Sequence, residues 1–175
     1  MLKWIGIVVL LCLAFILGLA ANRPSTIHIA RSARIGAPPE RVYPLIADLH
    51  AFNRWNPWAK MDPEIAIEYR GPRAGEGAVS AWTSDEVGSG SMEITQAREP
   101  EWIAIRLDFL EPFAATNEAS FTLKGVDGAT EVLWEMSGPA SFVQRVIGVF
   151  VDVDAMMGET FDDGLADLQR IAEAG

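Results

Sequence analysis

The sequence predicts an α+β domain in which an antiparallel sheet is covered on one face by a long C-terminal helix. Three observations support this fold class. Apolar residues alternate with polar ones through most of residues 64–137, as they do in half-buried strands. Short turns rich in glycine and proline separate these segments, which favours antiparallel neighbours. Residues 154–173 instead repeat their apolar side chains every three or four positions, as an amphipathic helix does.

The chain begins with an apolar segment. Trp4 to Ala21 is a run of 18 residues without a charged group. A helix of this length measures roughly 27 Å, close to the hydrocarbon thickness of about 30 Å. We therefore expect a transmembrane helix, with residues 1–21 as the anchor and residues 22–25 as a linker to a domain of residues 26–175. A cleaved signal peptide is the alternative, because a basic start followed by an apolar run serves both purposes.

An anchor would make the protein a single-pass membrane protein. Lys3 precedes the apolar run, whereas Arg23, Arg31 and Arg34 follow it, so basic residues flank both ends. Of the two orientations, we expect the one that places the soluble domain outside the cytoplasm.

The charge and the cysteine content exclude several functions. Apart from Lys3, the chain has 13 basic residues against 24 acidic ones. Binding to nucleic acid depends on clustered Lys and Arg, so nucleic acid is not expected as a partner. The single cysteine, Cys12, lies in the apolar run, which leaves the domain without a disulfide framework, a thiolate metal site or a cysteine nucleophile.

The first elements of the domain are a strand and a short helix. Residues 26–35 alternate as a half-buried strand. A proline pair at positions 38 and 39 favours the start of a helix over residues 41–49. The segment of residues 50–58 then holds three large aromatic side chains among Asn and Pro residues. Such rings bury a large area once they find a partner, so the segment forms either a cluster beneath a loop or the wall of an apolar pocket.

From residue 64 onward, the sequence predicts strands joined by short turns. The clearest is residues 103–109, in which every odd position is apolar. The same alternation marks residues 65–70, 92–95, 117–124 and 131–137, and residues 78–84 are predicted as another extended segment, which carries Trp82. One face of these strands collects large side chains and is expected to point inward. Its members are Tyr69, Trp82, Met92, Phe109, Phe121, Trp134 and Met136.

The C-terminal segment is the only one long enough to cover this apolar face. Its apolar stripe consists of Met157, Phe161, Leu165, Leu168 and Ala172. Asp154 is the expected N-cap of the helix. Upstream, the apolar residues 142–151 are interrupted by Gly148 and predict a shorter helix that could act as a flap.

In this order of elements, the chain resembles the START-like superfamily with the helix-grip fold, specifically its polyketide cyclase/dehydrase and lipid-transport group. The resemblance covers roughly residues 26–173. It rests on IGAPPERVY at residues 35–43, FNRWNPW at 52–58, GEGAVSAW at 75–82 and MMGETFDDGLADL at 156–168. It implies a sheet curled around its terminal helix, with an apolar cavity between them that opens near the first short helices and the flap. Polar pocket residues vary within the group, so no catalytic residue is carried over.

The candidate site follows from this implied cavity and from the inward face of the strands. Large aromatic side chains suit a packed core as well as a pocket wall, whereas methionine suits an adaptable wall. The candidate cavity residues are Trp55, Trp58, Tyr69, Trp82, Phe109, Trp134, Met157 and Phe161. The polar candidates are His50 and Asn56.

These observations lead us to expect a membrane-tethered binding domain for a hydrophobic or amphipathic small molecule, either a lipid or a polyketide-like compound. The membrane contact would be made by residues 4–21. Motifs for nucleophilic catalysis, phosphate binding or metal binding do not occur, so no cofactor or metal is expected and no catalytic residue is assigned. The acidic residues between 152 and 163 do not have the spacing of a calcium loop. The sequence leaves the oligomeric state open.

Two other functions stay open from the sequence. The first is a cyclase or dehydratase in which His50 and Asn56 position an aromatic polyketide; a buried His50 that points into the cavity would favour it. The second is a protein-interaction or chaperone-like module, which would need an exposed apolar groove along residues 142–151.

Overall fold

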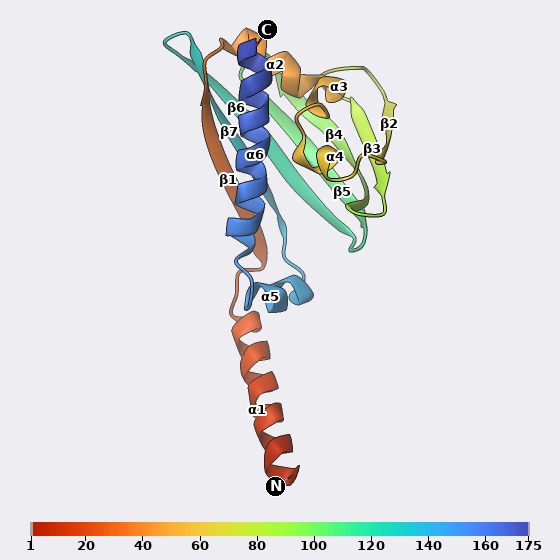
Figure 1. Cartoon of the computed structure of the whole chain (residues 1–175), viewed down its shortest axis with the longest axis vertical. Helices are drawn as coiled ribbons and strands as arrows, with labels where there is room; N and C mark the ends of the chain where they lie inside the picture. The colour runs from red at the N-terminus through yellow and green to blue at the C-terminus, as the bar shows by residue number, and fades with distance from the viewer. Residues whose placement is uncertain (1, 175) are drawn as a thin grey trace.

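The computed structural model describes residues 2–174 and shows an antiparallel sheet curled around a long C-terminal helix (Figure 1). The predicted membrane orientation depends on Lys3, and the single thiol belongs to Cys12; the side chains of both lie outside the described residues. The strands are β1 (Thr26–Ile35), β2 (Ala66–Arg70), β3 (Val79–Ser84), β4 (Gly88–Arg98), β5 (Trp102–Glu111), β6 (Ala115–Val126) and β7 (Ala129–Pro139). The helices are α1 (Leu2–Ala21), α2 (Pro39–Ala47), α3 (Leu49–Phe52), α4 (Pro57–Met61), α5 (Phe142–Gly148) and α6 (Val153–Ala174).

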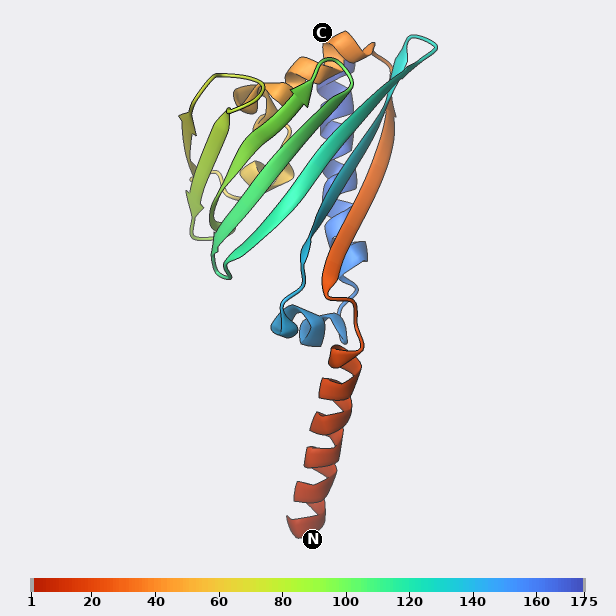
Figure 2. The same ribbon diagram turned by 180° about the vertical axis from the view of Figure 1, so that it is seen from behind.

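The seven strands form one sheet in the order β1-β7-β6-β5-β4-β3-β2, and every neighbouring pair is antiparallel. Strands β2 to β7 therefore make a meander, and β1 forms the other edge beside β7. Helix α6 lies inside the curve of the sheet, while the opposite face carries no helix (Figure 2). The predicted α+β class with a curved antiparallel sheet and a covering C-terminal helix is confirmed.

Helix α1 extends away from the domain at the end where α5 lies (Figure 1). Within residues 2–174, no helix is both long enough and apolar enough to cross a membrane. The predicted transmembrane anchor is therefore not found, and this finding contradicts the expected localisation as a single-pass membrane protein.

The predicted helix over residues 41–49 is divided in two. Asp48 adopts an extended conformation (φ −86°, ψ 109°), and its side chain accepts hydrogen bonds from the backbone N–H groups of His50 and Ala51. Asp48 thus ends α2 and caps α3 in a single step. Asn56 caps α4 in the same way by accepting from the backbone N–H of Trp58, and Pro57 occupies the first position of that helix.

Helix α6 starts one residue before the predicted cap. Asp152 Oδ1 accepts from the backbone N–H of Ala155 at 3.0 Å, so Asp152 caps the helix and the prediction of Asp154 is wrong. The Asp154 carboxylate instead pairs with the guanidinium of Arg31 on β1 at 3.2 Å. Gly158 makes room for this contact, because a Cβ there would lie 1.7 Å from Arg31 Nη2. The start of α6 is thereby held against β1.

Candidate functional site

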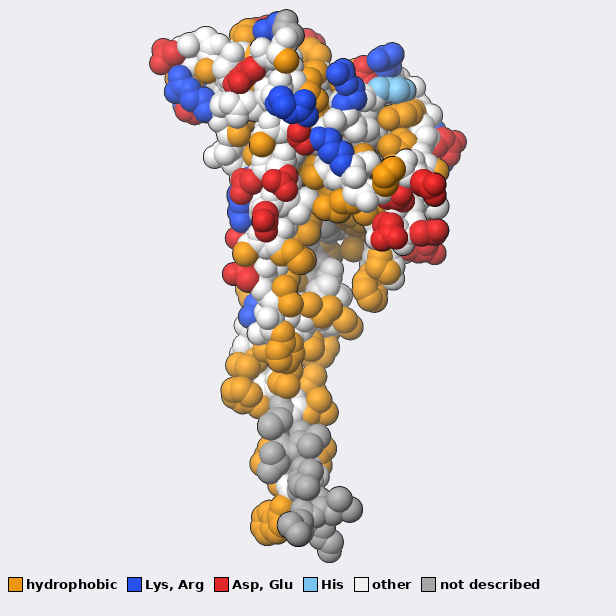
Figure 3. Space-filling view, in the orientation of Figure 1, with side chains coloured by type: hydrophobic (Ala, Val, Ile, Leu, Met, Phe, Trp, Pro, Cys, Tyr) orange, Lys and Arg blue, Asp and Glu red, His pale blue; other side chains and the backbone are white. Residues whose placement is uncertain are grey.

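A cavity of about 150 Å³ lies between the sheet, α4 and α6. Most of its wall is apolar, and none of the described residues that line it is charged. Its lining is Phe52, Asn53, Asn56, Trp58, Ala59, Ile65, Ile67, Ser80, Trp82, Val87, Met92, Ile105, Leu107, Phe109, Ala119, Phe121, Trp134, Met136, Met157 and Phe161. The molecular surface is hollowed between α6 and the part of the domain that contains α4 and β2, and hydrophobic side chains edge the hollow (Figure 3).

A cluster of aromatic rings forms the wall on the α6 side. Trp134 of β7 stacks on Phe161 of α6, with centroids 4.0 Å apart and planes inclined by 15°. Trp58 of α4 meets both rings edge-on, at 6.0 and 5.9 Å. Gly164 allows the close approach of α6, because a Cβ there would lie 2.9 Å from the Trp134 ring. These rings join three separate elements into one rigid wall.

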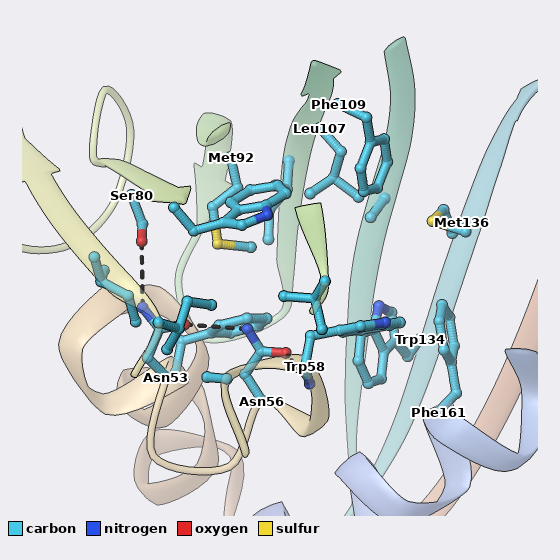
Figure 4. A pocket seen from close by; sticks show the side chains of 18 of the residues that line it. Asn53, Asn56, Trp58, Ser80, Met92, Leu107, Phe109, Trp134, Met136 and Phe161 are labelled. Carbon is cyan, nitrogen blue, oxygen red and sulfur yellow. Dashed lines mark hydrogen bonds between the residues drawn. The ribbon is translucent and has the colours of Figure 1, made fainter. Parts of the chain in front are cut away.

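The opposite part of the wall comes from alternate positions of the strands. Ser80 and Trp82 are two residues apart on β3 and therefore share a face. Trp82 meets Phe109 of β5 edge-on at 5.9 Å. Gly90 of β4 leaves room for Trp82, since a Cβ at Gly90 would lie 2.6 Å from its ring. Figure 4 shows Ser80 and Phe109 across the cavity from Trp58 and Trp134.

A small polar network lies at the end of the cavity near α3 and α4 (Figure 4). Asn56 Nδ2 donates to Asn53 Oδ1 at 3.1 Å. Asn53 Nδ2 in turn donates to the hydroxyl of Tyr69 at 3.0 Å and to that of Ser80 at 3.2 Å. The cavity therefore has one polar end and an otherwise apolar wall, an arrangement common in sites for small molecules.

His50 lies on the other side of Tyr69, beside a separate pocket lined also by Arg70 and Arg73. Its ring stacks on Tyr69 with a centroid distance of 3.7 Å, and its side chain is 44% exposed. His50 Nδ1 is 3.4 Å from Asp48 Oδ1. Burial alone would raise the pKa of Asp48, but hydrogen bonds from Arg73 and from the backbone N–H groups of His50 and Ala51 lower it below its ordinary value.

One ion pair joins the cavity wall to the covering helix. Lys60 of α4 pairs with Asp167 of α6, and Arg170 pairs with the same carboxylate. Hydrogen bonds from Lys60 and Arg170 lower the pKa of Asp167. The pair fixes α4, which carries Trp58, against α6.

The structure brings seven of the predicted site residues to the cavity. These are Asn56, Trp58, Trp82, Phe109, Trp134, Met157 and Phe161. The other three lie elsewhere. Trp55 is fully buried, and its indole N–H donates to the carbonyl of Leu45 at 2.8 Å, so it belongs to the core. Tyr69 and His50 line the second pocket.

Sequence reasoning missed the two residues that complete the polar end, Asn53 and Ser80. Each had a detectable signal. Asn53 is in the same aromatic segment as Asn56, three residues earlier, and this spacing brings side chains together in helical turns. Ser80 precedes Trp82 by two positions in a predicted strand, which places both on the same face. Among the described residues, no group of three His, Cys, Asp or Glu could hold a metal ion.

The fold and the cavity define a helix-grip domain with an internal apolar pocket. The chain belongs to the polyketide cyclase / dehydrase and lipid transport family, whose sequence profile matches residues 26–173. A comparison with curated proteins gives no match.

Several solved structures share the fold. Protein MLL2253 from Mesorhizobium loti has a TM-score of 0.63 at 14% identity, covering 85% of this chain and 98% of that one. Protein CV1439 from Chromobacterium violaceum has a TM-score of 0.61 at 17% identity, covering 86% and 99%. DynU16, from the dynemicin biosynthetic locus, has a TM-score of 0.59 at 17% identity, covering 83% of this chain and 47% of that one. At these identities, the similarity shows the fold alone.

Proposed function

We propose that the domain binds an apolar small molecule of about one ring in the cavity between the sheet and α6. The observation that carries this proposal is the cavity itself, about 150 Å³ in volume and lined by mostly apolar side chains. A cavity of about this volume is large enough to take up one benzene ring. Filling it would remove apolar ligand surface from water.

The volume also bears on the type of ligand. Sites for drug-sized molecules usually measure about 300–1,000 Å³, so a compact ring compound fits this cavity better than a long acyl chain. Met92, Met136 and Met157 line the wall, and methionine re-packs easily. Movement of these side chains would admit a somewhat larger ring system, as a polyketide-like ligand would require.

The test is a titration of the full chain with ethylbenzene, followed by thermal unfolding and by NMR shifts of the indole N–H groups. We expect saturable binding and a raised melting temperature. Leu107→Trp, which places a large side chain in the cavity, should abolish both effects. Leu110→Trp is the matched control, because Leu110 is on the same strand but 65% exposed. Equal effects of ethylbenzene on both variants would refute the proposal.

A co-purifying compound gives a second test. Native mass spectrometry of the full chain would reveal its mass. A ring compound of low mass supports the proposal, whereas a long-chain lipid would replace it with the lipid-binding alternative.

The cyclase or dehydratase alternative finds little support in the site. His50 is exposed and separated from the cavity by Tyr69. The described lining residues include no His, Asp, Glu, Lys, Cys or Tyr, the groups that supply most general acids and bases. The proposed function is therefore binding, without a reaction.

One observation favours a second candidate, the protein-interaction module. Helix α5 and the turn after it expose Phe142, Val143, Ile147 and Phe150, and hydrophobic side chains gather on this part of the surface (Figure 3). Exposed apolar patches of this kind mark interaction sites. Sedimentation of the full chain tests self-association through this patch. Association that Phe150→Asp abolishes would support it, and a monomer at all concentrations would refute it.

A further inference from the structure

The hydrogen-bond network at the polar end of the cavity has a fixed direction. The backbone N–H of Trp58 donates to Asn56 at 3.2 Å. A backbone N–H can only donate, so the Asn56 atom facing it is the carbonyl oxygen, and the Asn56 amide nitrogen must face Asn53. That nitrogen donates, so it meets the Asn53 oxygen, and the Asn53 nitrogen must face Tyr69 and Ser80. The cap of α4 thereby sets the orientation of the whole network.

This direction leaves protons without acceptors. Both amide hydrogens of Asn53 are used, and the Ser80 hydroxyl receives one of them. The hydrogen of Ser80 itself must therefore point elsewhere. Ser80 is 2% exposed and lines the cavity, yet no described residue accepts from it. The second amide hydrogen of Asn56 is also free, because only one is donated to Asn53.

From this arrangement we propose that the ligand is uncharged and carries a hydrogen-bond acceptor oxygen, such as that of a ketone, ester or ether, which accepts from Ser80 and Asn56. A ligand oxygen at this end would satisfy donors that the protein leaves unpaired. A carboxylate or an ammonium group would lose its hydration without meeting an opposite charge in the described lining. The inference rests on the proposed function, because it specifies the chemistry of the compound bound in the same cavity.

The experiment compares three probes built on one benzene ring. Ethylbenzene and acetophenone have nearly the same shape but differ by a carbonyl oxygen, and benzoate carries a charge. Each is titrated into the full chain, and binding is followed by NMR. We expect acetophenone to bind about 3- to 10-fold more tightly than ethylbenzene, the effect of one net hydrogen bond. Benzoate is expected to bind more weakly than either.

Ser80→Ala removes the donor and should make the two neutral probes bind about equally, with ethylbenzene binding retained. Ser120→Ala is the matched control. Ser120 lies on β6 between Ala119 and Phe121, which line the cavity, so its side chain is on the other face of the sheet. This variant should keep the preference for acetophenone.

The outcomes separate the two proposals. If none of the probes binds, the proposed function itself fails. If ethylbenzene and acetophenone bind equally to the unaltered chain, or benzoate binds best, the cavity binds ligands but the inference about the oxygen is wrong. Should Ser80→Ala fail to fold, the ratio measured on the unaltered chain still decides.

Discussion

The cavity makes a definite prediction for the substitution Ala119→Leu. Ala119 of β6 lines the cavity and is 6% exposed. Empty apolar space leaves the side chains around it without packing partners, which costs stability. The larger side chain would recover part of this cost.

The gain can be worked out from the atoms added. Leucine has three more carbons than alanine, and each buried methylene stabilises by about 0.8 kcal/mol, which gives an upper limit of about 2.4 kcal/mol. Imperfect rotamers reduce it, so we expect about 1–2 kcal/mol, or a melting temperature raised by about 2–8 °C. Ethylbenzene should then raise the melting temperature by less than half as much as in the unaltered chain.

The assay is thermal unfolding by calorimetry, with Ala172→Leu as the control. Ala172 of α6 is 1% exposed but does not line the cavity, so leucine there overpacks the core and should destabilise by about 1–3 kcal/mol. If Ala119→Leu destabilises as much as Ala172→Leu, the space at Ala119 is already filled and the reasoning fails.

Two further predictions concern the contacts of α6. Gly164→Ala should destabilise the fold by about 1–2 kcal/mol despite the better helix propensity of alanine, because its Cβ would meet the Trp134 ring at 2.9 Å. Ala166→Gly at an exposed position of the same helix measures the effect of helix propensity alone. If Gly164→Ala stabilises the fold by as much as Ala166→Gly destabilises it, the predicted clash with Trp134 is wrong. Asp167→Asn should destabilise by about 0.2–1 kcal/mol at pH 7 by removing the pair with Lys60. The pKa of Asp167 is lowered in the folded state. The difference in unfolding free energy between the unaltered chain and Asp167→Asn should therefore be largest above the unfolded carboxyl pKa of about 4, and it should vanish as the pH falls through the lower folded pKa. Denaturant unfolding across acidic pH measures it, and a difference that persists at the lowest pH would count against the ion pair.

Most of the fold could be predicted from local sequence patterns. The alternation at residues 103–109 identified β5, and the spacing of Phe161, Leu165 and Leu168 identified the buried face of α6. Such periods are set by the geometry of the strand and the helix themselves. The role of Asp48 was harder to predict. An aspartate at this position can continue one helix or cap the next, and the outcome depends on which backbone N–H groups need an acceptor.

The candidate site was predictable only in part. Trp55 and Trp58 are three residues apart and look equivalent in the sequence, yet one is sealed in the core and the other lines the cavity. Both rings meet Trp134, but Trp55 also packs on Phe52 and Phe121, whereas Trp58 packs on Phe161 of α6. The unpaired hydroxyl hydrogen of Ser80 could not be predicted either. It depends on the orientation of Asn53, which is set by Asn56, and Asn56 is oriented in turn by capping α4.

The sequence by itself determined the order of strands and helices, the inward face and the apolar nature of the site, because these depend on backbone periodicity and on the hydrophobic effect. Only the tertiary structure decided that space remains between α6 and the sheet, how large it is, and which polar atoms point into it. Packing fills or leaves space according to the fit of side chains from distant segments, and no local pattern in the chain records that fit.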